Sequence, residues 1–388
     1  MPDSAALRFQ TVFGREAEAV VRAPGRINLI GEHVDYLDGW VMPAAIDRHI
    51  EGAAAEIPER EIRIWTELAG TDAGAIATVS LDDLQRRGGS DSWMNYLIGV
   101  LAMLREAGVE PPGFEIALTA DLPTGAGLSS SAALETVTAL AVEALTGVAQ
   151  DPVDRALLCQ KAEHEYAGVP CGIMDQLAVG ASRAGHALMI DCRDLSLKPV
   201  PIPSGLALVV ADSRVKHALG DGEYRKRRED CESAAEILGV PTLRDASLDQ
   251  VQAAAEILGD RLFRRARHAV TEIERVHEFA TALENQDFAA IGRLMRAGHE
   301  SIRDDFEVSC AELDALVEAA YAFGPERGLV GSRMTGGGFG GSTISLVHEE
   351  ATSAFVEHLG ALFADQFDHP ASIFTTHAAE GARILDRE

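Results

Sequence analysis

The chain has 388 residues, of which 47% are hydrophobic and 24% charged, proportions that indicate a folded globular protein and exclude a disordered one. Its 61 acidic residues outnumber the 34 basic ones, giving a net charge of −27, and a surface this acidic repels nucleic acid and anionic membranes as binding partners. The 5 cysteines are widely spaced and include no CxxC pair, which favours a reduced, cytoplasmic protein without structural zinc or disulfides.

The chain is expected to form two lobes. Its length suits two domains of about 100 to 200 residues each. The composition changes after a proline-rich turn, PVPIPSG, at 199–205. We therefore predict an N-terminal lobe over residues 1–198 and a C-terminal lobe over 199–388, with a cleft between them. The opening residues MPDSAALRFQ lack the segments of a signal peptide, and no apolar run approaches the roughly 18 residues of a membrane-spanning helix, so we expect a cytoplasmic protein.

Hydrophobic periodicity predicts the first elements in chain order. The apolar run AEAVV at 17–21 indicates a strand that breaks at Pro24 and Gly25. Apolar residues recur at helical spacing over 93–104, with a capping residue before them and a glycine after. This pattern predicts a helix with one buried face.

The next elements surround a loop rich in glycine and serine. Alternation in FEIALTADLP at 114–123 predicts a half-buried strand, AALETVTALAVEALTG at 132–147 predicts a helix that ends at its glycine, and DRALLCQKAEHEYAG at 154–168 predicts another helix. In the second lobe we expect a strand at 206–212, four or five helices between about 222 and 323, and strands near 343–347 and 373–377 on either side of a helix.

The stretch PTGAGLSSSAA at 123–133 places two glycines and three serines directly before a predicted helix. Helix N-termini carry unpaired amides and a partial positive charge, and glycines let a phosphate approach the backbone closely. We therefore predict a phosphate-binding loop. The alternative is a tight turn with a serine cap. No lysine follows as in a Walker A motif, and Ser130 replaces the third glycine of a dinucleotide fingerprint.

A second glycine-rich stretch, TGGGFGGS, occupies 335–342. It matches GxGxxG literally, but the residues STISLV that follow the match are typical of a strand, so the helix that this motif requires is missing. So many glycines weaken regular structure. We expect a close backbone approach here, either to a ligand or to the first loop, and a plain flexible loop is the alternative.

Polar residues gather in an apolar setting near the start of the chain. The stretch GRINLIGEHVDY contains Arg26, Asn28, Glu32, His33 and Asp35. Because the flanking segments are apolar, we expect these groups inside the fold, where ionisable groups are paired or used. The absence of a second histidine or cysteine at ligand spacing disfavours a metal site. Binding of a neutral, hydroxyl-rich molecule fits the cluster better.

A third cluster, AEHEYAGVPCGIMDQ, contains Glu163 near a helix end and Asp175 after a break. We expect one of these carboxylates to hold a metal ion and the other to contact a substrate. Two solvated surface acids are the alternative.

Together these stretches resemble the GHMP small-molecule kinases, in particular the branch of that family that phosphorylates galactose. APGRINLIGEHVDYLDGWVMPAAI is similar to the sugar-binding signature of this branch and DLPTGAGLSSSAALE to the family's phosphate loop. PCGIMDQ and MTGGGFGGS are similar to its later motifs, and EYRKRREDCE to its substrate-side segment. These motifs follow the family's order from residue 22 to residue 343.

The resemblance implies a two-lobed α/β (α+β) fold, with a ribosomal-S5-like N-terminal lobe, a ferredoxin-like C-terminal lobe and the active site between them. It implies ATP and Mg²⁺ as cofactors. The implied sugar contacts are Arg26, Glu32, His33, Asp35, Gly172, Asp175 and Tyr224, with Asp175 and Arg26 catalytic. The implied nucleotide contacts are Trp93, beside adenine, and Gly125, Ala126, Gly127, Leu128, Ser129, Ser130 and Ser131. Ser131 and Glu163 are the implied Mg²⁺ ligands. The helical pattern alone predicts Trp93 as a core residue.

The implied reaction is phosphorylation of the anomeric hydroxyl of D-galactose. Asp175 is expected either to accept the proton of that hydroxyl or to orient it while remaining ionised, with Arg26 compensating its charge. N-Acetylgalactosamine is the alternative sugar, and a non-catalytic regulator that binds sugar and ATP is the alternative class. We expect small-molecule partners and a monomer.

Departures from the family pattern are few. Ser342 stands where the family usually has cysteine, and Trp40 and Met42 stand where smaller side chains or leucine are common. We expect Ser342 to be tolerated as another small residue, and Trp40 to affect local packing and not the chemistry.

Overall fold

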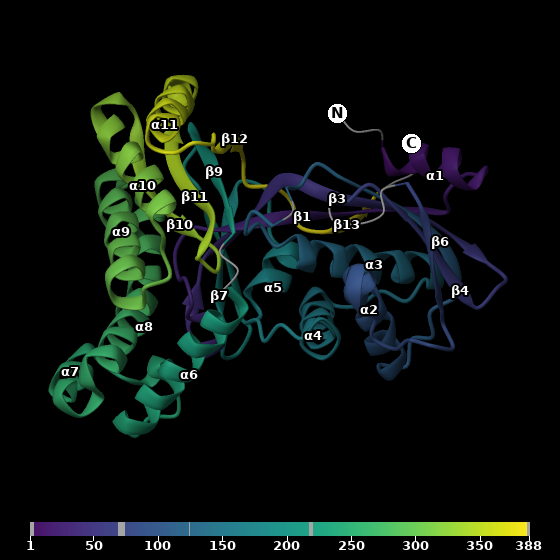
Figure 1. Cartoon of the computed structure of the whole chain (residues 1–388), viewed down its shortest axis with the longest axis horizontal. Coiled ribbons are helices and arrows are strands. Elements are labelled where there is room, and N and C mark those ends of the chain that lie inside the picture. The colour runs from purple at the N-terminus through teal and green to yellow at the C-terminus, as the bar shows by residue number, and fades with distance from the viewer. Residues whose placement is uncertain (1–3, 69–73, 124, 217–219, 386–388) are drawn as a thin grey trace.

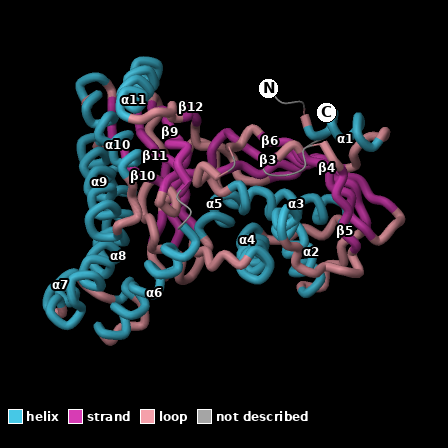
Figure 2. The backbone as a smooth tube through the Cα atoms, in the orientation of Figure 1, coloured by secondary structure: helices cyan, strands magenta, loops and turns pink. Residues whose placement is uncertain are grey.

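The computed structural model describes residues 4–68, 74–123, 125–216 and 220–385. The molecule is elongated, with a sheet and its helices in each half (Figure 1). Helices and strands are mixed in both halves (Figure 2), in agreement with the predicted α/β class. None of the helices within these ranges is long and apolar enough to span a lipid bilayer.

The first half is built on a six-stranded sheet with the order β13-β1-β3-β6-β4-β5, antiparallel except between β4 and β6. Its strands are β1 Ala19–Asn28, β3 Pro43–Ile57, β4 Glu61–Thr66, β5 Ile76–Ser80, β6 Gly113–Ala120 and β13 Arg383–Leu385. Below the sheet in Figure 1 lie α2 Asn95–Glu106, α3 Ser130–Thr146, α4 Pro152–Ala162 and α5 Met174–Ala181. Helix α1, Ala5–Phe13, lies on the opposite side.

Strand β6 is covered on both faces, and all of its residues except the last are buried. The strand predicted at 114–123 is therefore present, ending at Ala120, but the prediction that it is only half-buried is wrong. Its second face packs against α1, where Ala117 joins Phe9 in one hydrophobic cluster. Glu115 on that face is neutralised by Arg15, whose Nη2 lies 3.0 Å away. The second face of β6 is thus buried although its residues, among them Ala117 and the paired Glu115, do not form an apolar pattern in the sequence.

Strand β1 does not end at Pro24 as predicted. It continues to Asn28, and its register against β3 shifts between Pro24 and Arg26. A Cβ added at Gly25 would lie 2.9 Å from the main-chain oxygen of Leu128, so the bulge needs glycine. The expected break is a bulge inside a continuous strand, and the strand carries Arg26 onward to the cleft described below.

The predicted helices of the first half are present, with differences at their ends. Helix α3 ends at Gly147, whose φ of 72° forms a left-handed cap. Helix α2 begins at Asn95, later than predicted, because Trp93 belongs to the 3-10 helix η2, Gly89–Met94. Helix α4 continues into the π-helical turn η3, Glu163–Ala167.

The second half contains a four-stranded antiparallel sheet with the order β10-β11-β9-β12. Its strands are β9 Leu206–Lys216, β10 Leu329–Thr335, β11 Gly340–His348 and β12 Ser372–Thr376. Its helices are α6 Gly220–Leu238, α7 Leu248–Ala253, α8 Ala255–Glu284, α9 Phe288–Ser301, α10 Ala311–Phe323 and α11 Thr352–Gln366. Periodicity does not predict β10 because its buried residues, LVGSRMT, are mostly small or polar.

The two halves are joined by shared structure. A three-stranded sheet is formed by β2 Trp40–Val41, β7 His186–Asp191 and β8 Leu197–Pro201. The predicted boundary between residues 198 and 199 falls inside β8. The chain also returns to the first sheet at its end, where Leu385 of β13 pairs with Val20 of β1. The division into two domains at residue 198 stays a prediction.

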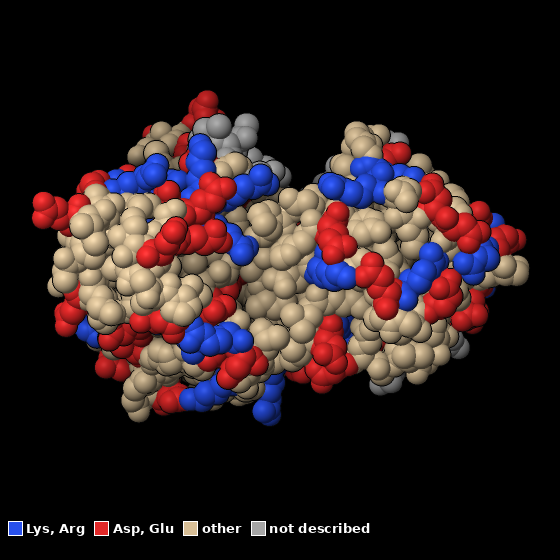
Figure 3. Space-filling view, turned by 90° about the horizontal axis from the view of Figure 1, so that it is seen from below, with Lys and Arg blue, Asp and Glu red and all other residues tan. Residues whose placement is uncertain are grey.

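Charged groups of both signs are interspersed on the face shown in Figure 3. A waist of uncharged residues separates the two halves in that view.

Candidate active site

A cleft of about 440 Å³ is lined by residues from both halves. Its walls come from the end of β1 with the β1–β2 loop (residues 29–39), the serine-rich loop before α3 (residues 123–131), the stretch from η3 to α5, the start of α6, and the glycine-rich loop between β10 and β11 (residues 336–339). These segments are far apart in the sequence, so the fold brings them together.

Asp175, in the first turn of α5, is held by two donors. Nε and Nη2 of Arg26 lie 2.8 and 2.7 Å from its Oδ1, and the Ser129 hydroxyl donates to its Oδ2 at 2.6 Å. The Arg26 side chain is 5% exposed and that of Asp175 is 23% exposed, so a buried support presents the carboxylate to the cleft. Nη1 of Arg26 also donates to the Gly127 carbonyl at 2.6 Å, which ties the serine-rich loop to β1.

Ser129 precedes α3 but does not cap it through its side chain. Its φ of 58° is left-handed, and its side chain makes no capping hydrogen bond. Gly125 and Gly127 also have positive φ, 74° and 75°. The described residues of this loop therefore do not adopt the simple serine-capped turn that was the alternative, and the amides at the start of α3 have no cap from Ser129, as a phosphate site requires. Thr124 lies outside the described residues.

The glycine-rich loop packs against the serine-rich loop. A Cβ added at Gly336 would lie 3.1 Å from the Gly127 carbonyl oxygen. The Ser342 hydroxyl donates to the Ala126 carbonyl at 2.7 Å. The close backbone approach predicted for 335–342 is thus confirmed as an approach to the first loop. Ser342, a departure from the family pattern, links the two loops.

Glu32 connects the β1–β2 loop to the glycine-rich loop. It is 1% exposed, its Oε1 accepts from the Gly336 amide at 2.7 Å, and its Oε2 accepts from Nδ2 of Asn28. Burial raises the pKa of Glu32 to about 7, although Arg333 and these hydrogen bonds act in the opposite direction. Glu32 lines the cleft while both of its oxygens are bonded to the protein.

His33 has a left-handed backbone with φ of 60°. Its Nε2 donates to the Gly337 carbonyl at 3.0 Å, so Nδ1 accepts from the Tyr36 hydroxyl at 3.1 Å. Burial lowers the pKa of His33 to about 4, which makes the ring neutral near pH 7. The Tyr224 ring, from α6, lies 5.2 Å from that of His33 and 5.4 Å from that of Tyr36. These three rings form an aromatic wall.

Asp35 lies directly against Gly172. A Cβ added at Gly172 would stand 1.8 Å from Oδ2 of Asp35, so only glycine leaves room for this carboxylate. Burial and, after it, the charge of Asp175 raise the pKa of Asp35 to about 6. Two carboxylates and one guanidinium, that of Arg26, therefore face the same part of the cleft.

Glu163, in η3, lines the same cleft as Ser131 at the start of α3. Its Oε2 accepts from Gln176 at 2.7 Å and from the Cys171 thiol at 3.3 Å, and it is also hydrogen-bonded to Ser131. Burial and the charge of Asp175 raise the pKa of Glu163. Hydroxyl and carboxylate oxygens are the ligands that Mg²⁺ prefers. Groups of three or more histidine, cysteine, aspartate or glutamate side chains that could hold a metal ion are absent from the described ranges.

Most of the predicted site residues line the cleft. They are Arg26, Glu32, His33, Asp35, Gly125, Gly127, Leu128, Ser129, Ser130, Ser131, Glu163, Gly172, Asp175 and Tyr224. Ala126 is only 1% exposed and lies behind the lining. Trp93 is half-buried against the hydrophobic core and is not among the lining residues, so it is only in part the core residue that the helical pattern predicts. Its place beside adenine stays a prediction.

Sequence reasoning missed several residues at or behind the cleft. Phe339 and Arg225 line it, and both lie inside motifs quoted above, although neither is among the predicted site residues. Two residues of α8, His268 and Glu272, bond to the β1–β2 loop from behind. The sequence has no signal for them, because one histidine and one glutamate in an amphipathic helix look like exposed residues.

Three family models match the chain. They are described as "Galactokinase galactose-binding signature", matching residues 7–56, "GHMP kinases N terminal domain", matching 95–183, and "GHMP kinases C terminal", matching 279–365. A galactokinase of Canis lupus familiaris is 42% identical over 97% of this chain and 95% of its own length. A galactokinase of Streptomyces coelicolor is 45% identical over 97% of each chain. The chain belongs to the galactokinase family.

Solved structures agree with this family. The crystal structure of Lactococcus lactis galactokinase complexed with galactose has a TM-score of 0.92 and 33% identity, covering 98% of each chain. The mevalonate kinase of Methanococcus jannaschii, at 20% identity and a TM-score of 0.66 over 93% of this chain and 98% of its own, shares the fold. The predicted GHMP kinase fold is confirmed.

Proposed function

We propose that this protein transfers the terminal phosphoryl group of ATP to the anomeric C1 hydroxyl of D-galactose, giving galactose 1-phosphate and ADP. The observation that carries the proposal is the carboxylate of Asp175, which Arg26 and Ser129 hold at the cleft between the β1–β2 loop and the serine-rich loop. Membership of the galactokinase family supports the choice of sugar, as does the relative complexed with galactose.

Phosphoryl transfer requires mainly that the reacting groups are positioned and that the charge on the transferring phosphoryl group is compensated. Asp175 accepts a hydrogen bond from the C1 hydroxyl. It then either takes the proton as the C1 oxygen attacks the terminal phosphorus, or remains ionised and orients the hydroxyl. Arg26 compensates the carboxylate charge, and Ser129 fixes its rotation.

The serine-rich loop is the proposed phosphate site. ATP is an anion, and a chain with a net charge of −27 needs local attraction to bind it. The amides at the start of α3 supply that attraction. Ser131 and Glu163 would hold Mg²⁺ next to this loop. When bound, the ion offsets charge on the phosphate oxygens of the nucleotide.

The β1–β2 loop and α6 form the proposed sugar side. Asp35 offers carboxylate oxygens to sugar hydroxyls, and Tyr224 offers a ring and a hydroxyl. The polar atoms of Glu32 and His33 bond within the protein, so these residues shape the pocket as well as lining it. A site built to pair a hydroxyl rejects an epimer that leaves its groups unpaired, and we expect discrimination against glucose.

The experiment that tests this function measures ADP release by the purified protein with Mg²⁺, ATP and one of three sugars: galactose, glucose or N-acetylgalactosamine. The proposal predicts the highest kcat/KM with galactose and a value at least about 100-fold lower with glucose. A preference for N-acetylgalactosamine would change the substrate. No ADP release with any sugar would contradict catalysis and favour a regulator that binds sugar and ATP.

A further inference from the structure

Helix α8, which belongs to the second half, binds the main chain of the β1–β2 loop. Oε1 of Glu272 accepts hydrogen bonds from the amides of Gly31 at 2.9 Å and Glu32 at 3.2 Å. Nε2 of His268, one helical turn earlier, donates to the carbonyl of Glu32 at 3.1 Å. Two side chains of one helix thus hold three main-chain groups of two successive residues in the cleft wall.

Glu272 is fully buried, which is unusual for a glutamate. Its side chain is 0% exposed, as is that of Arg333, whose Nη2 lies 2.8 Å from Oε1. Nε of Arg275 lies 2.8 Å from Oε2. Burial opposes the charge of Glu272, but the two arginines lower its pKa below the ordinary value. A Cβ added at Gly298 would stand 2.6 Å from Nη1 of Arg333, so the surroundings are shaped for this ion pair.

Stability alone is a weak reason for such a pair. Desolvation of two charges offsets most of their attraction, and apolar residues of similar volume often stabilise a core as well or better. An apolar side chain at position 272 could not accept hydrogen bonds from the two amides. Without the Glu272 carboxylate, the amides of Gly31 and Glu32 would be buried without partners.

Glu32 itself lines the cleft, and the bonded residues lead directly into the rest of the loop that lines it, His33 and Asp35. His33 follows at once, in the left-handed conformation with φ of 60°. A left-handed residue other than glycine costs about 1 kcal/mol or more and persists where neighbouring contacts determine it. By fixing Gly31 and Glu32, helix α8 provides such contacts from behind. The orientation of His33 and Asp35 toward the cleft depends on this turn.

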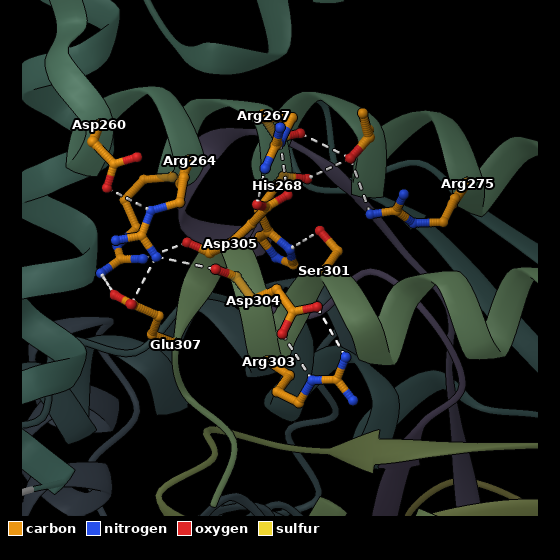
Figure 4. Close-up of polar contacts among 12 residues, drawn as sticks. Asp260, Arg264, Arg267, His268, Arg275, Ser301, Arg303, Asp304, Asp305 and Glu307 are labelled. Carbon is orange, nitrogen blue, oxygen red and sulfur yellow. Dashed lines mark hydrogen bonds and ion pairs between the residues drawn. The ribbon is translucent and has the colours of Figure 1, made fainter.

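Helix α8 is itself locked in place. Figure 4 shows its contacts with the end of α9, with the π-helical turn η5, Ile302–Phe306, and with the residue after that turn: His268 with Ser301, Arg267 with Asp305, and Arg264 with Glu307. The Phe306 ring lies 4.4 Å from that of His268 and 5.0 Å from that of His33. The Val308 carbonyl accepts from the Phe339 amide at 2.7 Å, so the same support reaches the glycine-rich loop.

We propose that Glu272 and His268 are positioning residues for sugar binding, which act through the main chain of Gly31 and Glu32 and do not touch the sugar. The second half would then set the affinity for galactose through a helix behind the site. This inference rests on the proposed function, because the sugar is the ligand whose affinity it concerns.

The test compares glutamate and histidine variants with a matched control. E272Q keeps the size of the side chain but weakens its hold on the amides and on Arg333. H268L removes the donor to Glu32, whereas H268Q places an amide nitrogen near the position of Nε2. The control is E143Q. Glu143 is 4% exposed and accepts from Arg155 at 2.6 and 2.8 Å, so it is also a buried glutamate paired with arginine, but it does not line the cleft.

We expect E272Q and H268L to raise the KM for galactose by about 10-fold or more, since small misplacements of a site cost up to about 100-fold. The KM for ATP should change less than 2-fold, roughly within the error of such comparisons. H268Q should recover most of the loss seen in H268L. E143Q should lower the unfolding temperature without raising the KM for galactose.

Hydrogen–deuterium exchange supplies a readout that does not require catalysis. Peptides covering residues 28–36 should exchange faster in E272Q and H268L than in the wild-type protein or E143Q. Unchanged exchange there, together with an unchanged KM for galactose in a folded H268L protein, would overturn the inference. If the wild-type protein releases no ADP with galactose, the proposed function fails, while exchange in 28–36 still decides whether α8 positions the loop.

Discussion

Arg26 and Asp175 stand 149 positions apart in the chain, yet the guanidinium of one lies 2.7 Å from the carboxylate of the other. β1 contributes the arginine and α5 the aspartate. The arginine occupies Oδ1 and Ser129 occupies Oδ2, so the position and rotation of the carboxylate are both determined. A carboxylate held in this way at a cleft beside an amide-rich loop is suited to transfer between a hydroxyl and a phosphate.

Replacing Asp175 with asparagine should lower kcat by at least about 100-fold, the usual loss on removing a general base. The side chain keeps its size but loses its charge and its capacity to take a proton. Steady-state ADP release with saturating galactose checks the loss, and titration with an ATP analogue should show nucleotide affinity close to that of the wild-type protein. Near-normal turnover in D175N would exclude Asp175 as the catalytic carboxylate.

Ser129 offers a separate test of how the carboxylate is held. Both S129A and S129G remove the hydroxyl that donates to Oδ2, but alanine is strained at a φ of 58° and glycine is not. A hydrogen bond to a charged group contributes about 1.5 to 3 kcal/mol, so kcat should fall about 10-fold or more in both variants. If S129G keeps the wild-type rate while S129A loses it, the residue matters for its backbone and not for its hydroxyl.

Gly172 should tolerate no side chain. In G172A the new Cβ would stand 1.8 Å from Oδ2 of Asp35, so the carboxylate must move and the kcat/KM for galactose should fall by about 10-fold or more. G180A is the matched control, because the nearest atom to an added Cβ there is 3.8 Å away. Alanine in that helical position should stabilise the protein by about 0.5 to 1 kcal/mol. Equal activity of the two variants would argue against a role for Asp35.

The affinity for galactose should depend on pH through Asp35. Burial and the charge of Asp175 raise the pKa of Asp35 to about 6, so the carboxylate that accepts sugar hydroxyls gains a proton as the pH falls through that value. At pH 5 about a tenth of the molecules keep it ionised, and the KM for galactose should rise about 10-fold from its value at pH 7.

The D35N variant isolates this effect, because Glu32, with a pKa of about 7, also titrates in the range. D35N should bind galactose more weakly at pH 7 and lose most of the rise between pH 7 and pH 5. Parallel pH profiles for D35N and the wild-type protein would assign the dependence to another group. The effect on folding has the opposite sign, since a carboxyl with a raised pKa destabilises the fold as the pH rises through that value.

Some parts of this site can be predicted from the sequence, because residues of these types in such patterns seldom serve the fold alone. Repeated glycines and serines before a helix, or ionisable groups in an apolar stretch, cost folding free energy unless the chain uses them. That logic finds Arg26, Glu32, His33 and Asp35, and the serine-rich loop. The roles drawn from the family resemblance, including Mg²⁺ at Ser131 and Glu163, stay predictions.

Other parts depend on contacts that no local pattern encodes. Glu272 meets Gly31 across 241 positions, and its helix shows only ordinary amphipathic spacing. Strand β10 is not predicted from the sequence because it contains polar residues such as Arg333. Arg333 is buried because Glu272 neutralises its charge. Strand β6 looked half-exposed because alanine and a paired glutamate form its second face. In each case tertiary packing overrides the pattern.

The most direct test of the central claim identifies the product. The purified protein is incubated with ATP, Mg²⁺ and galactose, and the phosphorylated sugar is examined by phosphorus and proton NMR. The account predicts a sugar phosphate whose phosphorus couples to the anomeric proton, formed by the wild-type protein and not detectably by D175N. Phosphate on any other carbon, or equal product from both proteins, would contradict it.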